Sequence, residues 1–133
     1  MMENYRDLEV FKCGEEIVDL TRALIASFDE EKDQFEMGQM MLENAYTITA
    51  KIANAEGGDL YGHRIDNATL IKLAAKELLA QCSLSRKLRL TDPAYLQLLI
   101  DELSHFRMHF LEWVAAFNKE NDVVDDWSFH HFH

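Results

Sequence analysis

Two glutamates and two histidines in the last third of the chain have a spacing that could hold a metal ion. Glu102, His105, His109 and Glu112 are three, four and three positions apart, so on a helix they form one stripe. Glu102 and His105 make a Glu-x-x-His element, which di-iron bundles use twice, together with a carboxylate from each of two further helices. The second element is absent because Ala80 stands where its histidine is needed. We therefore predict no metal and no cofactor, with Glu102, His105 and His109 as the residues to test.

Other catalytic patterns are also absent. Small helical ribonucleases need an arginine five to seven residues before a histidine, and no histidine here has one. Helical nucleotide pyrophosphatases use paired acidic motifs to hold magnesium, whereas Glu15-Glu16 and Asp19 form a single cluster. The chain has no phosphate loop, no Gly-x-Ser-x-Gly elbow and no dinucleotide fingerprint. No catalytic or cofactor-binding residue is predicted, and we expect a protein that is not an enzyme.

Charge is distributed unevenly along a chain whose net charge is −11. Residues 1–63 carry 14 acids and 5 bases, residues 64–91 carry 2 acids and 6 bases, and residues 92–133 carry 8 acids and 2 bases. The pattern fits either self-association by charge complementarity or a solvated surface with no partner. A nucleic-acid-binding face is the further alternative, and it would use the bases of the middle segment: Arg64, Lys72, Lys76, Arg86, Lys87 and Arg89.

Four periodic segments predict the fold. The first covers about residues 6–27, the second runs from about Asp33 to Gly57-Gly58, and the fourth starts with Asp92 and Pro93 as cap and first residue and ends near residue 118. Residues 59–66 lack a period, so we expect them to be the longest loop, with Asn67 capping the third helix. Four such segments with short connections predict an all-α, antiparallel up-down-up-down four-helix bundle over residues 1–118, followed by an acidic and aromatic tail, 119–133.

The expected core positions repeat at three- and four-residue steps, which place them on one face of each helix. They are Val10, Phe11, Ile17, Val18, Leu24 and Ile25; Met37, Met41, Ile48, Ile52 and Ala55; Leu70, Ile71, Ala74, Leu78 and Cys82; and Leu96, Leu99, Leu103, Phe106, Phe110, Trp113 and Phe117.

The fourth segment carries more apolar residues than one bundle can bury. Leu98, Met108 and Leu111 fall outside its core stripe. They predict an interface with another copy of the chain; the alternative is that they pack beneath loops or the tail. In the tail, Trp127, Phe129 and Phe132 could dock into a groove, while His130, His131 and His133 could bind a transition metal adventitiously.

Composition and cysteine usage place the chain among folded cytosolic proteins. It has 133 residues, of which 48% are hydrophobic and 28% charged, with one proline. Cys13 and Cys82 are far apart and lack a Cys-x-x-Cys partner, so both are expected to be reduced and partly buried. The N-terminus has no signal-peptide pattern, and no apolar run approaches the ~20 residues of a membrane span. We predict a cytoplasmic protein without membrane contact.

The sequence from Tyr5 to Phe11, Tyr-Arg-Asp-Leu-Glu-Val-Phe, resembles the opening of the four-helix proteins encoded in ribosomal-RNA intervening sequences. That family begins with an aromatic residue, a basic residue, Asp-Leu, a variable residue, Val and an aromatic residue. Ile48, Ile52-Ala53 and Glu56-Gly57 are similar to the family's Ile-Ala-Glu-Gly ending of the second helix. Thr49 replaces its usual proline, and Leu42-Glu43 replace its usual basic pair.

The resemblance implies a four-helix bundle that assembles as a pentameric ring and has no known enzymatic activity. The family is related to accessory proteins of diversity-generating retroelements, which bind a reverse transcriptase and nucleic acid through a basic surface. Our first hypothesis is therefore a non-enzymatic, ring-forming homo-oligomeric interaction module. The alternative is a nucleic-acid-binding accessory protein, which the acidic net charge and the missing basic pair disfavour, since phosphate contacts need clustered Lys and Arg.

Overall fold

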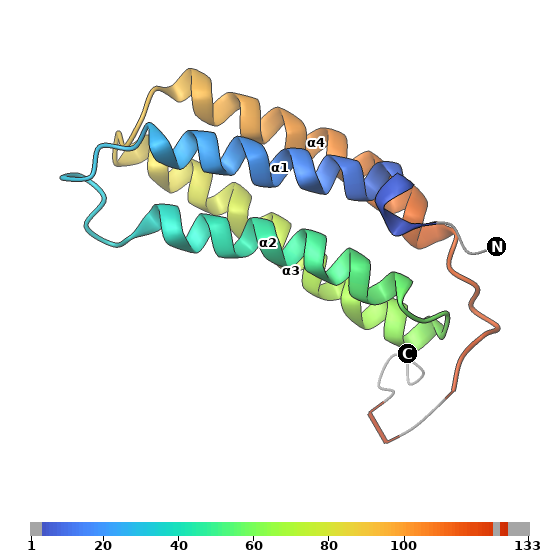
Figure 1. The fold of residues 1–133 in the computed structure, drawn as a ribbon. Coiled ribbons are helices and arrows are strands. Elements are labelled where there is room, and N and C mark those ends of the chain that lie inside the picture. The colour runs from blue at the N-terminus through green and yellow to red at the C-terminus, as the bar shows by residue number, and fades with distance from the viewer. Residues whose placement is uncertain (1–3, 124–125, 128–133) are drawn as a thin grey trace.

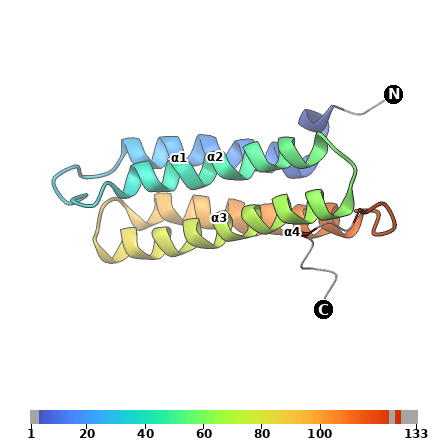
Figure 2. The ribbon, with the colours of Figure 1, turned by 90° about the horizontal axis from the view of Figure 1, so that it is seen from below.

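The part of the chain that the structure describes folds as four antiparallel helices, which confirms the predicted all-α bundle. The computed structural model describes residues 4–123, 126 and 127. After a short 3-10 turn, Tyr5–Asp7, the helices are α1 (Glu9–Ala26), α2 (Met37–Glu56), α3 (Tyr61–Lys87) and α4 (Pro93–Ala115). The α1–α2 and α3–α4 connections lie at one end of the bundle and the α2–α3 connection at the other (Figure 1). Viewed after a quarter turn, α1 and α2 form one layer over α3 and α4 (Figure 2).

One continuous core fills the space between the helices and includes almost all of the predicted positions. Ile17, Ile48, Leu78 and Leu99 are among the fully buried side chains. Ile25 and Phe110 are only partly buried. The prediction that Leu70 belongs to the core is wrong, because its side chain is exposed. Cys13 and Cys82 are both free thiols and are buried more completely than the sequence predicted. Burial of apolar surface on this scale is the main term that stabilises such a bundle.

The prediction that Asn67 caps the third helix after a long loop is wrong. Helix α3 begins six residues earlier, at Tyr61, and Asn67 is a buried residue inside it. Its side-chain amide donates to the His63 carbonyl oxygen at 2.9 Å, and its Oδ1 accepts a bond from Asn54 Nδ2 of α2 at 3.1 Å. The first turn of α3 shows no apolar period because the residue it buries is Gly62, which has no side chain.

The longest connection is instead residues 27–36, between α1 and α2. The second helix begins at Met37, not near Asp33, and Asp33 accepts bonds from the backbone N–H groups of Met37 and Gly38 at 2.7 and 3.3 Å. Glu36, directly before the helix, has a left-handed φ of 53°. The α3–α4 connection lies at the same end of the bundle and contacts residues 27–36 (Figure 1). The Asp29 N–H donates to the Leu90 carbonyl oxygen at 2.8 Å.

Helix α4 starts as predicted, with Asp92 Oδ1 accepting a 2.9 Å bond from the Ala94 N–H and Pro93 at the first helical position. It ends at Ala115, three residues before the predicted end. The chain then returns to the α2–α3 connection, where Asn121 accepts a 2.6 Å bond from the Tyr61 N–H. Of the tail aromatics, Phe129 and Phe132 lie outside the described residues, as do His130, His131 and His133.

The four helix pairs are packed unequally. Helices α2 and α3 make the most extensive contact, α1 contacts both α2 and α4 closely, and α3 and α4 share the smallest contact. Two polar pairs fix the register of α2 against α3: Asn54 with Asn67, and Asn44 Nδ2 donating to Gln81 Oε1 at 3.0 Å. Each pair has one buried member, Asn67 or Gln81, and a shift of register would leave that buried amide without its partner. The α3–α4 side is therefore the least tightly packed side of the bundle.

Candidate functional site

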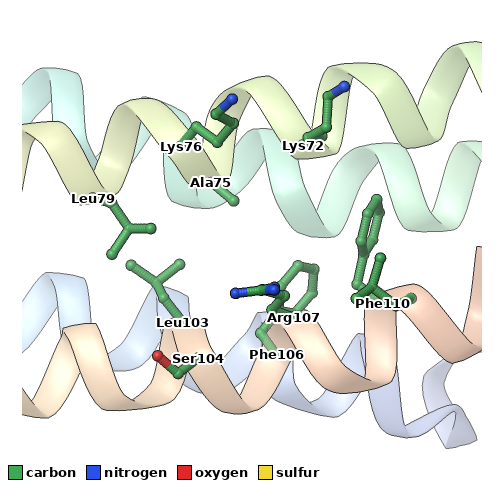
Figure 3. Close-up of a pocket in the computed structure, with 10 residues that line it drawn as sticks. Lys72, Ala75, Lys76, Leu79, Leu103, Ser104, Phe106, Arg107 and Phe110 are labelled. Atoms are coloured by element: carbon green, nitrogen blue, oxygen red, sulfur yellow. The ribbon is translucent and has the colours of Figure 1, made fainter.

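A groove of about 380 Å³ runs between α3 and α4. Its floor is apolar and consists of Leu103, Phe106 and Phe110 of α4 together with Leu79 of α3. Figure 3 shows Leu79 and Leu103 pointing toward one another across the groove, with Phe106 and Phe110 farther along α4. Leu111, one of the predicted interface residues, lines the same groove. An apolar floor of this size that faces solvent is typical of a binding surface.

A second apolar groove, also about 380 Å³, lies on the opposite flank of α4, against α1. It is lined by Leu98 and Tyr95 of α4 and by Leu20 and Ala23 of α1, among others. The predicted interface residues Leu98, Met108 and Leu111 are all exposed, by 56%, 63% and 54%. They do not line one groove, and Met108 lines neither of the two. Leu98 belongs to the α1–α4 flank and Leu111 to the α3–α4 flank.

The two flanks of α4 carry opposite charge. Lys72 and Lys76 of α3 and Arg107 of α4 surround the α3–α4 groove, and the amino groups of the two lysines turn outward from it (Figure 3). On the α1–α4 flank the residues that line the groove are uncharged, but acids lie beside it. Glu102 is one helical turn beyond Leu98, and Glu16 of α1 is close enough to Cys13 to act on its thiol, as is Glu9, which pairs with Lys12 at 3.6 Å. We call these surfaces the basic groove and the acidic flank.

The six bases considered for nucleic acid are not equivalent. At about 3.6 residues per turn, Lys72, Lys76, Arg86 and Lys87 fall within about 100° of the circumference of α3 and make one stripe. Arg89 follows the helix, in the turn to α4. Arg64 has a structural role instead, because its Nη2 donates to Glu56 Oε1 at 2.6 Å.

The structure brings His105 and His109 together and adds a residue that the sequence analysis missed. His109 Nε2 lies 3.2 Å from His105 Nε2. Cys13, 92 positions earlier and on α1, places its Sγ 3.6 Å from His105 Nδ1, and Glu102 Oε1 is 3.4 Å from the same nitrogen. One ligand atom from each of Cys13, His105 and His109 lies within 4.8 Å of the others. Only the docking of α1 on α4 brings the thiol there, so spacing along one helix could not reveal it.

Cys13 lies in an environment that disfavours its thiolate. Burial raises the pKa of the Cys13 thiol to about 11, and the negative charge of Glu102 and, more weakly, of Glu9 and Glu16 acts in the same direction. Cys13 is 4% exposed. A thiol with so high a pKa is a poor nucleophile at neutral pH, so Cys13 is not arranged for covalent catalysis. The same carboxylates would attract a cation.

No described helix combines the length and apolar content that crossing a bilayer requires. Comparison of the whole chain with models of protein families, with curated proteins and with solved structures finds no match in any of the three.

Proposed function

We propose that this protein is a non-enzymatic interaction module that assembles with copies of itself into a closed ring. The observation that carries the proposal is the pair of apolar grooves on opposite flanks of α4, which a single chain leaves exposed. The two grooves differ in lining, and the charges on or beside them differ in sign. The proposed contact therefore joins two different surfaces, the basic groove of one subunit and the acidic flank of the next. Such head-to-tail interfaces produce rings when the rotation closes.

Charge complementarity supports this pairing. Lys72, Lys76 and Arg107 surround one groove, while Glu102 and Glu16 lie along the other flank. Opposite charges at the rim speed association and select the partner, whereas the apolar centre supplies most of the affinity. The resemblance to intervening-sequence proteins implies five subunits, and a pentamer is the assembly that we propose.

Light scattering on the purified full chain tests the proposal. We expect an oligomer of defined mass at both low and high salt, with weaker association at high salt because the rim charges are screened. Leu111→Asp in the basic groove and Leu98→Asp on the acidic flank should each give a folded monomer. Leu70→Asp is the matched control, because Leu70 is an exposed leucine of α3 that lines neither groove, and it should assemble like the unchanged chain.

Mixing the two single variants distinguishes this arrangement from a symmetric dimer. In a head-to-tail interface, the intact acidic flank of Leu111→Asp can still pair with the intact basic groove of Leu98→Asp, so the mixture should form a one-to-one dimer and nothing larger. Monomers at both salt concentrations in the unchanged chain would refute the proposal. A mixture that stays monomeric while each variant is folded by circular dichroism would refute the pairing of the two flanks.

Nucleic-acid binding is a second candidate because four bases share one stripe of α3. We expect it to appear as a salt-sensitive shift of a structured RNA or DNA, with log affinity falling in proportion to log salt. Arg86→Ala with Lys87→Ala should weaken the binding and reduce the salt slope by about 2. Lys12→Ala with Lys51→Ala, which removes two bases outside the stripe, serves as the control. The absence of any shift at low salt would remove this candidate.

A further inference from the structure

We propose that Cys13, His105 and His109 form a binding site for a divalent transition metal ion, Zn²⁺ by preference, between α1 and α4. The three side chains come from two helices and converge at one place. Thiolate and imidazole are the ligands that zinc favours. The site is separate from both apolar grooves, because none of the three residues lines either one.

Each of the two short distances in the cluster, taken singly, is close to the distance between two ligands of tetrahedral zinc. Bond lengths of about 2.3 Å to sulfur and about 2.0–2.1 Å to nitrogen put the ligand atoms about 3.6 Å apart for sulfur and nitrogen and about 3.3 Å apart for two nitrogens. The structure has 3.6 Å between Cys13 Sγ and His105 Nδ1, and 3.2 Å between the Nε2 atoms of His105 and His109. These two distances use different nitrogens of His105. A rotation of the half-exposed His105 ring is therefore needed to bring one nitrogen to the ion.

The surrounding charges favour a bound cation. Glu102 Oε1 is 3.4 Å from His105 Nδ1, so it can orient the ring or take the fourth position on the metal. Glu112 Oε2 lies 3.9 Å from His109 Nδ1 and is placed to do the same for the second ring. Binding replaces the proton of the Cys13 thiol by the metal, and the proton leaves to solvent. The carboxylates that disfavour a bare thiolate stabilise a thiolate neutralised by a cation.

A metal here would connect the first and the last helix of the bundle. Cys13 is buried on α1, whereas on α4 His105 is exposed and His109 is partly buried. An ion held by three protein ligands leaves its fourth position to Glu102 or to water. Because ligands that bind the folded state alone stabilise it, zinc should raise the unfolding temperature.

Cobalt and zinc titrations of the reduced full chain test this site. His130, His131 and His133 are first changed to Asn, so that the tail cannot supply ligands. We expect one Co²⁺ per chain, with the strong visible absorption of a tetrahedral ion and a near-ultraviolet thiolate-to-cobalt band, both removed when Zn²⁺ displaces the cobalt. His109→Asn should weaken binding by more than about 100-fold and Glu102→Gln by about 10- to 100-fold.

Matched variants identify the ligands. Cys13→Ser should abolish the thiolate band, whereas Cys82→Ser, which changes a buried cysteine of α3, should leave the spectrum intact. His63→Gln is the corresponding control for histidine. If Cys13→Ser does not fold, His109→Asn still decides the question, because His109 is only partly buried and lies outside the core. A thiolate band that persists in Cys13→Ser, unchanged affinity in His109→Asn, or the weak spectrum of octahedral cobalt alone would refute the site. None of these readouts depends on oligomer assembly.

Discussion

Replacing Glu56 should destabilise the bundle clearly more than replacing an exposed acid such as Glu43. Glu56 is the last residue of α2, and its Oε1 accepts bonds from Arg64 Nη2 of α3 at 2.6 Å and from Trp113 Nε1 of α4 at 2.7 Å. The guanidinium carbon of Arg64 in turn lies 4.4 Å from the centre of the Phe117 ring. One carboxylate therefore joins three helices, and Glu56→Ala removes two charge-assisted bonds together.

The expected loss follows from how far this pair is removed from solvent. Exposed ion pairs contribute about 0–1 kcal/mol, and breaking a fully buried one costs about 3–5 kcal/mol. The side chains of Arg64 and Glu56 are 18% and 22% exposed, between these limits. We expect Glu56→Ala to lower the free energy of unfolding by about 2–3 kcal/mol. Glu56→Gln, which keeps an acceptor for Trp113, should cost about half as much.

Urea denaturation at equal protein concentration measures both variants. If the free energy of unfolding falls by about 2 kcal/mol per molar urea, Glu56→Ala should lower the urea concentration at the unfolding midpoint by about 1 M. Glu43→Ala changes an exposed glutamate of the same helix and should stay within about 0.5 kcal/mol of the unchanged chain. A double-mutant cycle with Arg64→Met should give a coupling of about 1–2 kcal/mol. If Glu56→Ala falls within the range of the Glu43 control, the three-helix network does not stabilise the fold.

Two further predictions concern local features of α3. Arg89 follows α3 with a left-handed φ of 55°, and the next residue, Leu90, donates its N–H to the Ser85 carbonyl oxygen at 3.1 Å. Because glycine adopts this φ without strain, Arg89→Gly should raise the free energy of unfolding by about 0.5–1 kcal/mol in urea denaturation. A loss of stability would contradict this. Burial raises the pKa of the Cys82 thiol from 9.0 to about 11. Its neutral form therefore contributes stability below about pH 9 that is lost as pH rises toward 11, up to about 3 kcal/mol. Cys82→Ala should lose stability less steeply over that range, and equal slopes would count against this assignment.

The sequence predicted those parts of the fold that local periodicity and capping determine. Asp92 and Pro93 placed the start of α4 correctly because a capping side chain and a proline act within one turn. The start of α3 was missed because its first turns bury Gly62 and Asn67. Their burial depends on distant segments: Asn67 contacts Asn54 of α2, and Gly62 donates to Asp122, which follows α4. A buried asparagine inside a helix looks in sequence like one at its start.

The candidate sites likewise have features that the sequence could predict and features that it could not. Exposure of Leu98 and Leu111 could be predicted because both lie outside the core stripe of α4. Their placement on opposite sides of that stripe also follows from helix geometry, because thirteen residues rotate by about 220°. Which neighbouring helix lies on each side could not be predicted, because it depends on how the four helices pack. The contact of Cys13 with His105 spans 92 positions, and no spacing rule within one helix connects them.

The metal site and the assembly surface share the acidic flank of α4, and this determines how they should influence each other. A divalent ion that replaces one thiol proton adds a single net positive charge beside Glu102 and Glu16. His105 is seven residues from Leu98, or about 10 Å along the helix, which is comparable to the Debye length of about 8 Å at physiological salt. The charge is thus largely screened from the apolar contact.

We therefore expect zinc to leave the number of subunits unchanged and to weaken association by less than about tenfold at physiological salt, a change of less than about 1.4 kcal/mol. Light scattering of metal-free and zinc-loaded protein measures this directly. Assembly that appears only with zinc would contradict the expectation, because it would mean that a neighbouring subunit supplies the fourth ligand. The subunits would then be joined by the metal, and apolar contact between the two flanks of α4 would not be sufficient to hold them together.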